Sequence, residues 1–307
     1  MNNIEEYRKL CETEGHNIPL FLQYWWMETV CHGKQWDVAL ARDSEGNIAA
    51  AMPYLIGSKM GLRYVLQPQL TQYNGPWYRP NANQPEATRQ LMEHFAGLRL
   101  ALFNQNFSPA VTSIEGWKGY QNTSRVTYRI EDISNPEEVF NHFDKRHRQR
   151  QIRHCQPLLH PTEVLPSDFA NLHTQYWLSR GKKDLLSQAF MTRIIAKTLQ
   201  RGQGILLGLN DTNGNLQAAR FVAFDSHCAY SLLSALNPRG HLGGASPLLF
   251  WHIIQQLSTR TRSFDFEGSM VPSIAYSYSL YGAQPVTYYQ MTRYSNPLMR
   301  ALFKKKI

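Results

Sequence analysis

The sequence predicts an α+β protein whose mixed sheet is built from two copies of one α/β module. The first observation is a repeated hairpin, because residues 36–52 and residues 204–220 each hold a β-rich run, an Asp-x-x-Gly-Asn turn and a second β-rich run. In both turns Gly and Asn supply the positive φ that a tight hairpin connection requires. The second observation is that the same order of elements follows each hairpin, which a chance match would not produce.

The elements after the two hairpins correspond one by one. In the first module the pattern predicts a strand, a glycine-containing loop, a helix and two further strands, at residues 63–67, 84–96, 98–103 and 125–130. In the second module it predicts a strand, a glycine-rich loop, a helix and two further strands, at residues 229–236, 247–257, 263–267 and 285–291. Matching Val-Thr-Tyr triplets at 126–128 and 286–288 are expected to close the two modules.

Helices are expected to open the second module. Asn135 is a predicted N-cap, with Pro136 at the first helical position and Glu138 at the third. Two more helices are predicted near residues 167–180 and 187–201. The chain is therefore expected to divide into a first module at residues 1–132 and a second module at residues 133–307.

Composition excludes several classes of protein. The 307 residues are 43% hydrophobic and 12% aromatic, which excludes disorder as a description of the whole chain. The longest mostly apolar stretch, residues 48–57, is about half the length of a membrane-spanning helix, and the N-terminus has no secretory pattern. Four cysteines without paired spacing indicate reduced thiols and a cytoplasmic location. No P-loop, no zinc spacing and no nucleophile elbow is present, so no bound metal is expected.

The order of elements resembles the GNAT acyltransferase fold, and two copies in one chain resemble the FemAB-like group of aminoacyl and acyl transferases. The runs that carry the resemblance are residues 144–154, 237–251 and 264–269, followed by Tyr281-Gly282 and a closing strand. It implies tandem GNAT-like modules that transfer an acyl group to an amine without a covalent enzyme intermediate. The implied co-substrate is acyl-CoA or aminoacyl-tRNA, with no tightly bound cofactor. The implied acceptor is a small-molecule amine or a peptidoglycan precursor.

The glycine-rich loop of the second module is the candidate donor site. Ser246 followed by Pro247 predicts a helix start, and glycines before a helix N-terminus favour an anion. In the GNAT fold this loop holds the pyrophosphate of acyl-CoA, although here Arg239 lies one residue too far upstream and Pro247 lacks an amide donor. The alternative is that the glycines only allow close packing of the helix. The candidate residues are Arg239, Gly240, Gly243, Gly244, Ala245 and Ser246.

Three side chains are candidates for catalysis. Alternation along the strand at 263–267 places Asp265 and Glu267 on one face, where they can orient or deprotonate an amine. The alternative is a solvated sheet face or a salt bridge to the basic segment. Tyr278, four residues before Gly282, matches the GNAT tyrosine that protonates the leaving group, and packing against the core is its alternative role.

Positive charge is concentrated in two short segments of a chain whose net charge is +9. Residues 144–154 hold five Lys or Arg against one Asp, and Lys304, Lys305 and Lys306 form a basic tail. Such clusters favour an anionic partner, and a solvated helix face is the alternative.

Five residues are candidates for binding the substrate or an anion. Arg146, Arg150 and Arg153 are expected to form one helical stripe suited to a tRNA backbone. Tyr73 and Trp77 belong to a polar–aromatic loop that either lines the acceptor cleft or makes ordinary turns. A non-catalytic binding protein with a basic surface for a nucleotide or nucleic acid is the rival hypothesis, and membrane attachment through the basic tail is a third.

Overall fold

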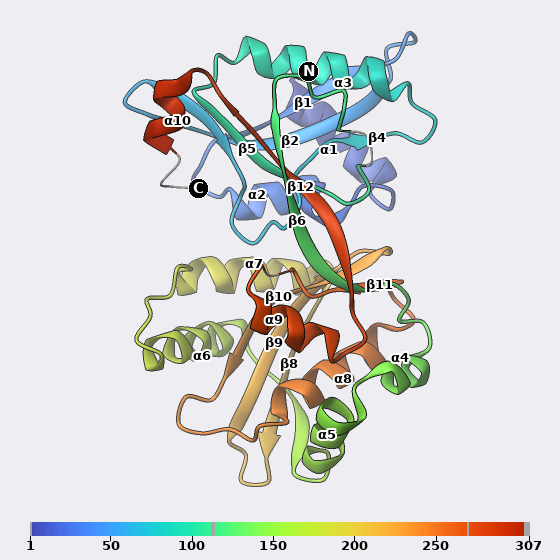
Figure 1. Cartoon of the computed structure of the whole chain (residues 1–307), viewed down its shortest axis with the longest axis vertical. Coiled ribbons are helices and arrows are strands. Elements are labelled where there is room, and N and C mark those ends of the chain that lie inside the picture. The colour runs from blue at the N-terminus through green and yellow to red at the C-terminus, as the bar shows by residue number, and fades with distance from the viewer. Residues whose placement is uncertain (1, 112–113, 269, 304–307) are drawn as a thin grey trace. The chain divides into compact units, whose positions relative to one another are not determined.

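The computed structural model in Figure 1 describes residues 2–111, 114–268 and 270–303. The chain forms two compact units. Unit 1 consists of Met1–Arg125 together with Thr287–Ile307, and unit 2 consists of Val126–Val286. The basic tail at residues 304–306 lies outside the described residues.

Unit 1 is a sheet with a long helix packed across one face. Its strands follow the order β1-β2-β3-β5-β12, with β4 on β2. Only the β3–β5 pair is parallel, among the described pairs of this unit. The strands are β1 (Trp36–Arg42), β2 (Ile48–Lys59), β3 (Leu62–Leu66), β4 (Trp77–Tyr78), β5 (Leu102–Phe107) and β12 (Gln284–Tyr294). The helices are α1 (Asn3–Glu14), η1 (Leu20–Leu22), α2 (Tyr24–Val30), α3 (Gln84–Gly97) and α10 (Pro297–Phe303).

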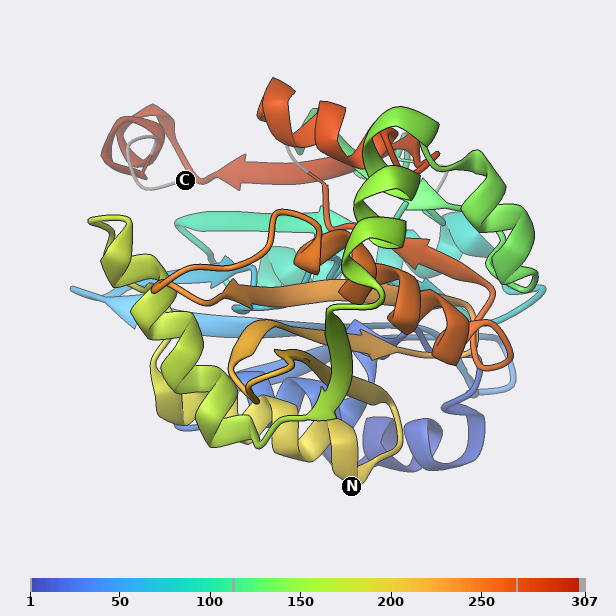
Figure 2. The same ribbon diagram turned by 90° about the horizontal axis from the view of Figure 1, so that it is seen from below.

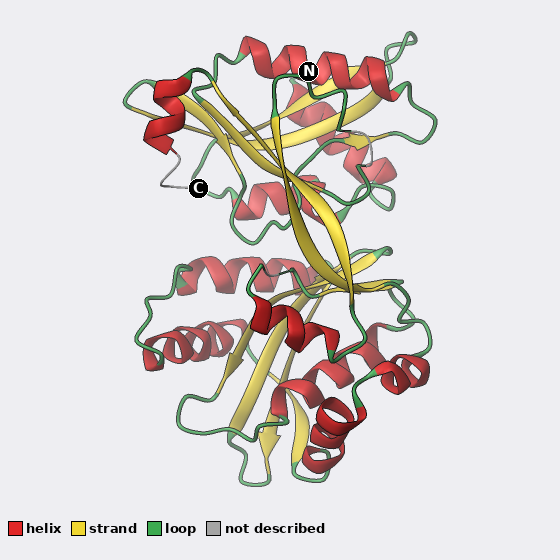
Figure 3. Ribbon diagram, viewed as in Figure 1, coloured by secondary structure: helices red, strands yellow, loops and turns green. Residues whose placement is uncertain are grey.

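Unit 2 is a sheet between helices on both faces (Figures 2 and 3). Its strands follow the order β6-β11-β10-β9-β8-β7, with β10 and β11 parallel. The strands are β6 (Gln121–Ile130), β7 (Leu159–Glu163), β8 (Gly204–Asp211), β9 (Leu216–Phe224), β10 (Cys228–Leu236) and β11 (Ser263–Asp265). The helices are α4 (Pro136–His142), η2 (Lys145–Gln149), α5 (Arg150–Cys155), α6 (Pro166–Ser179), α7 (Gln188–Gln200), α8 (Ala245–Leu257) and α9 (Pro272–Ser279).

The two predicted hairpins form with the same turn. In β1–β2 the Asp43 side chain accepts the Asn47 N–H at 2.9 Å, and in β8–β9 Asp211 accepts the Asn215 N–H at 2.9 Å. The turn glycines Gly46 and Gly214 have φ of 85° and 80°, a region that only glycine enters without strain. The mixed α/β architecture that the repeat predicted is therefore confirmed.

The strands that close the two sheets are exchanged relative to the prediction. Residues 289–294 of β12 pair with β5 in unit 1, and residues 129–130 of β6 pair with β11 in unit 2. The expectation that 126–128 closes the first module and 286–288 the second is thus corrected. Alternating hydrophobicity predicts a strand but does not determine its partner. The division into modules at residues 132 and 133 stays a prediction.

Several predicted boundaries also differ. Helix α8 begins at Ala245 with Gly244 as its N-cap, so Ser246 is not the cap and Pro247 lies inside the first turn, where no intrahelical donor is lost. Strand β11 ends at Asp265 rather than at residue 267. The first-module strand predicted at 98–103 lies at Leu102–Phe107.

Candidate active site in unit 2

An arginine side chain lies on the face of the sheet that α8 covers. Arg220 lies in the middle of β9, on the same face as Ala218 and Val222, which belong to the core under α8. Its guanidinium donates to the hydroxyl of Ser231 and, at 3.1 Å, to that of Ser246 in the first turn of α8. Its Nε atom is enclosed without a hydrogen-bond partner, and burial lowers its pKa. No carboxylate lies within ion-pair distance of Arg220 among the described residues.

Asp265 and Glu267 lie together where β11 ends, in different environments. Asp265 is fully buried, and its carboxylate accepts from the Thr127 hydroxyl, from the Glu267 N–H at 2.7 Å and from Arg129 at 3.1 Å. Asp265 therefore forms its salt bridge with Arg129 on β6 and not with the basic segment at residues 144–154. These bonds fix the Asp265 side chain, and its bond to the Glu267 N–H holds the turn that follows β11. In this turn Glu267 has a left-handed φ of 59°.

Glu267 is the less satisfied of the two carboxylates. Its Oε1 atom is enclosed and has no hydrogen-bond partner. Burial, and then the charge of Asp265, raise the pKa of Glu267 well above its ordinary value. A carboxyl group in this state is a stronger base than an exposed one, and such perturbed groups gather at functional sites.

Tyr278 lies within electrostatic reach of both Arg220 and Glu267. Burial raises the pKa of its hydroxyl, the charge of Arg220 opposes that shift, and the charge of Glu267 adds to it. Its ring also packs 4.7 Å from the ring of Phe266, between centroids, and against the core of unit 2. Tyr278 therefore packs against the core and also lies close enough to Arg220 and Glu267 for their charges to affect its hydroxyl.

Arg148 is a second arginine that joins this region. It donates to the hydroxyl of Ser277 on α9 at 2.6 Å, and its guanidinium lies 4.5 Å from the centroid of the Tyr281 ring. Its Nε is also enclosed without a partner. The segment that carries it, η2, is a π-helical turn in which the Gln149 N–H bonds to the Asp144 carbonyl five residues earlier. Such turns occur frequently at functional sites.

The start of α8 is packed closely against α5. A Cβ on Gly244 would meet the Cys155 Sγ and the Gln151 carbonyl oxygen, both at 2.6 Å, so this glycine is required for the contact with α5. The Ala245 N–H bonds to the Leu242 carbonyl oxygen at 2.9 Å. Gly243 has open space around it. Arg239 is exposed beside Gly240, which has a φ of 138°.

The other predicted binding residues are either exposed on η2 and α5 or buried in unit 1. Arg146, Arg150 and Arg153 are exposed on η2 and α5, and the π-helical turn breaks the single helix that their stripe assumed. Tyr73 and Trp77 are buried in unit 1, where the Trp77 indole donates to the Asn17 carbonyl at 3.0 Å. Their predicted role in substrate binding stays a prediction.

Sequence reasoning missed Arg220 and Arg148. The signal for Arg220 is present, since it is the only charged residue in the strand Leu216–Phe224. Arg148 carried no signal of its own, because it is one of five basic residues in a short segment.

None of the four cysteines, all of which lie in the described ranges, forms a disulfide, and Cys31, Cys155 and Cys228 are buried. No helix in the described ranges is both long enough and apolar enough to cross a membrane.

Comparisons with known proteins agree with this architecture. In solved structures, FemX matches with a TM-score of 0.73 and 10% identity, over 98% of this chain and 98% of that chain. The C-terminal domain of a putative lysylphosphatidylglycerol synthetase from Agrobacterium fabrum matches with a TM-score of 0.62 and 12% identity, over 99% and 96%. A tandem GNAT protein from the clavulanic acid biosynthesis pathway matches with a TM-score of 0.56 and 12% identity, over 96% and 95%.

No curated protein sequence shows significant similarity to the chain. The model of the acetyltransferase (GNAT) domain family matches residues 137–291, which is half of the chain and includes Arg148, Arg220, Glu267 and Tyr278. With the tandem GNAT-like fold already in view, this match shows that the chain belongs to the acetyltransferase (GNAT) domain family and is an acyltransferase.

Proposed function

We propose that unit 2 transfers an acyl group to the nitrogen of an amine, with Glu267 as the general base. The observation that carries the proposal is the enclosed, unpartnered Oε1 of Glu267 beside a second carboxylate. An ammonium group has no lone pair, so it must lose a proton before it can attack a carbonyl carbon. A carboxylate whose pKa is raised above its ordinary value is suited to take that proton.

The remaining steps follow from the positions of Tyr278 and Arg220. The free amine attacks the acyl carbonyl carbon, a C–N bond forms, and the bond from that carbon to the donor's sulfur or oxygen breaks. The departing atom takes a proton from the Tyr278 hydroxyl. Arg220 favours the anionic form that Tyr278 then adopts, because its charge lowers the pKa of that hydroxyl. The nitrogen loses its second proton to the tyrosinate as the amide forms, which restores Tyr278, and solvent then removes the proton that Glu267 took.

An ester donor such as aminoacyl-tRNA is the better match to these residues. A donor thiolate is a weaker base than a tyrosinate, whereas a ribose alkoxide is a stronger one, and the raised pKa of Tyr278 suits the stronger base. At the start of α8, the Ala245 N–H is already bonded to the Leu242 carbonyl oxygen, and Pro247 has no N–H. Fewer backbone donors are therefore available to bind a pyrophosphate at residues 243–246. Acyl-CoA is the second candidate donor, favoured by the match to the GNAT domain. The proposed acceptor is an amine of a small molecule or of a peptidoglycan precursor.

The test compares Glu267→Gln with Glu163→Gln in the full chain. Glu163 is an exposed residue at the end of β7 and serves as the matched control. Each protein is incubated with an amine panel and either charged tRNA or acetyl-CoA, and amide formation is followed by mass spectrometry. We expect Glu267→Gln to lose about 10²–10⁴-fold in rate, the range for a general base, with unchanged circular dichroism. Wild-type rates in Glu267→Gln would contradict the assignment.

A further inference from the structure

Two adjoining pockets lie against α3 in unit 1, and neither belongs to the site in unit 2. One has a volume of about 540 Å³ and extends along α3 to residues 116–119. The other has a volume of about 200 Å³ and extends toward the start of β5. Ala96 and Arg293 line both pockets, so the two form one groove, which we call the α3 groove. A volume of this size is typical of small-molecule sites.

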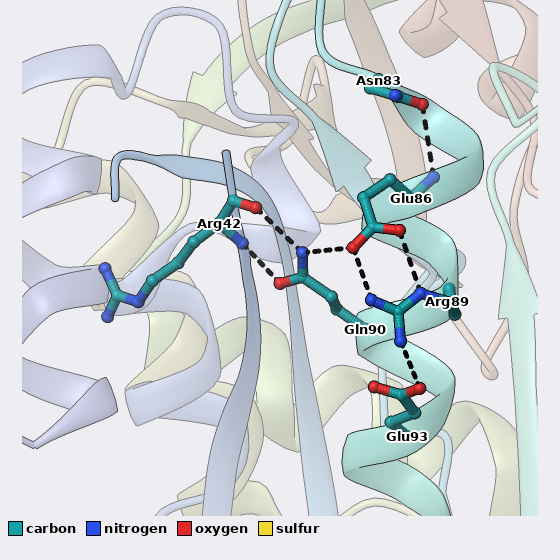
Figure 4. Close-up of polar contacts among 6 residues, drawn as sticks. All are labelled: Arg42, Asn83, Glu86, Arg89, Gln90 and Glu93. Carbon is teal, nitrogen blue, oxygen red and sulfur yellow. Dashed lines mark hydrogen bonds and ion pairs between the residues drawn. The ribbon is translucent and has the colours of Figure 1, made fainter. Parts of the chain in front are cut away.

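The acidic side chains of α3 are already paired. Figure 4 shows the Arg89 guanidinium held between Glu86 and Glu93, with Nη2 at 2.6 Å from the Glu86 carboxylate. Glu86 also accepts from the Gln90 amide at 3.0 Å. These bonds lower the pKa of Glu86 to about 2, with the Arg89 hydrogen bond as the largest cause. Glu93, the carboxylate that lines the α3 groove, is thus already bound by Arg89 within the helix.

Three cations in the α3 groove lack such a partner. Lys118 and Arg293 line the larger pocket, and Arg99 and Arg293 line the smaller one. Among the residues that the structure describes, none of the three lies within ion-pair distance of a carboxylate. Three unpaired cations around a concave surface favour an anion of more than one charge.

The groove also has an apolar surface. Met92 in the larger pocket and Leu100 in the smaller one are partly exposed, and the rings of Phe95, Phe103 and Tyr120 are buried behind the smaller pocket. The Arg293 guanidinium lies 5.5 Å from the centroid of the Tyr120 ring. Arg293 is therefore placed at the junction of the two pockets, with an apolar surface beside its charge.

The backbone at Arg99 supplies an independent observation. Arg99 follows the C-cap of α3 and has a φ of 51°, a conformation in which helix ends usually carry Gly or Asn. A residue with a Cβ at this position costs on the order of 1 kcal/mol. A cation is thus held at the mouth of the groove in a conformation that a neutral asparagine would adopt with less strain.

We propose that the α3 groove binds an organic phosphate. The phosphate group contacts Arg293, with Lys118 and Arg99 on either side, and the organic part of the ligand lies against the partly exposed side chains of Met92 and Leu100. A phosphate monoester carries up to two charges and three acceptor oxygens, which suits three cations better than a single carboxylate does. The site lies outside residues 137–291 and does not depend on the proposed acyl transfer.

The test measures binding of phenyl phosphate to the full chain by calorimetry, at low and at physiological salt. Inorganic phosphate is the probe for the charge alone, and phosphatidylglycerol vesicles are the probe for a lipid source. The variants are Arg293→Gln, Lys118→Ala and Arg99→Asn, and the control is Lys9→Ala, an exposed cation on α1. Gly243→Asp, which blocks the start of α8, separates this groove from the anion site predicted in unit 2.

We expect phenyl phosphate to bind more tightly than inorganic phosphate, and each groove variant to weaken it about ten-fold or more, as for loss of a charged hydrogen bond. Arg99→Asn should do so without lowering the melting temperature. Lys9→Ala and Gly243→Asp should bind like the wild type. Equal binding by Arg293→Gln, loss of binding in Gly243→Asp, or binding of vesicles without binding of phenyl phosphate would each overturn the proposal.

Discussion

The β1–β2 hairpin of unit 1 and the β8–β9 hairpin of unit 2 carry different kinds of side chain at the corresponding position. Met52 on β2 pairs with Ala39, and Arg220 on β9 pairs with Leu207, in matching register. Met52 is fully buried in the core under α3, whereas Arg220 brings a charge to the face under α8. One unit therefore uses this position for packing, and the other places there a cation with no carboxylate partner in the described structure.

The starts of the two covering helices differ in the same direction. Helix α3 is capped by Asn83, whose side chain accepts the Glu86 N–H at 3.3 Å. Helix α8 starts at Ala245 with Gly244 as its N-cap and without a side-chain cap, and Arg220 contacts its first turn through Ser246. The comparison shows that a side chain caps the covering helix in unit 1, whereas in unit 2 the covering helix has no side-chain cap.

The largest expected effect comes from placing the cation of unit 2 into unit 1. Met52→Arg should lower the free energy of unfolding by about 3–5 kcal/mol, because the charge would be buried without a partner. Urea denaturation measures the change, with Met52→Leu as the control, expected to cost less than about 1.5 kcal/mol. A Met52→Arg protein as stable as the control would break the comparison.

The reverse exchange tests what the cation does in unit 2. Arg220→Met should keep or raise the free energy of unfolding, since an enclosed charge is removed. We expect its acyl-transfer rate to fall about 10²–10³-fold, the loss seen when one charge-stabilising donor is deleted. Steady-state kinetics and urea denaturation of the same protein check both parts. Unchanged kinetics would show that Arg220 takes no part in the reaction.

A smaller effect separates the two glycines before α8. Gly244→Ala should destabilise the protein by about 1–3 kcal/mol, because its Cβ would press on Cys155 and Gln151 at 2.6 Å. Gly243→Ala should change the stability by no more than about 0.5 kcal/mol, since its Cβ would meet no atom within 4 Å. Thermal melts compare the two variants, and equal melting temperatures would contradict the packing account.

The last prediction is a pH dependence of the protein's stability that comes from the titration of Glu267. Its folded-state pKa is raised by burial, so its contribution to stability is complete below the unfolded pKa, near 4.3, and is lost as pH rises through the folded pKa. Glu267→Gln resembles the protonated form at every pH. The melting temperature of the wild type should therefore fall relative to this variant as pH rises from about 4 toward neutrality. Calorimetry at a series of pH values measures the difference, and a constant difference would show that the pKa is not raised.

Local patterns predicted the hairpins and most helices because the responsible interactions lie within a few residues. The Asp43 and Asp211 turns each close through bonds to an asparagine four residues later, which a short stretch of sequence reveals. The exchange of β6 and β12 was not predictable in this way, because β12 pairs with residues nearly two hundred positions away. The sequence pattern predicted the strand β12 but not its pairing with β5.

The candidate site shows the same limit. Asp265 and Glu267 were selected from alternation, yet β11 ends between them, and bonds from Thr127 and Arg129 decide that Asp265 anchors the bend while Glu267 is left unsatisfied. Arg220 contacts Ser246 and acts on Tyr278 only in the folded unit, where α8 packs over β9.

The sequence by itself determined the repeated module, the two hairpin turns, the glycine-rich entry to α8 and the residue types available for acyl transfer. Those features depend on backbone preferences and on hydrophobic periodicity, which act over a few residues. The tertiary structure decided which strands close each sheet, that the pKa of Glu267 is raised, and that Arg148 and Arg220 are enclosed. These outcomes depend on desolvation and on contacts between distant segments, and both exist only once the chain is packed.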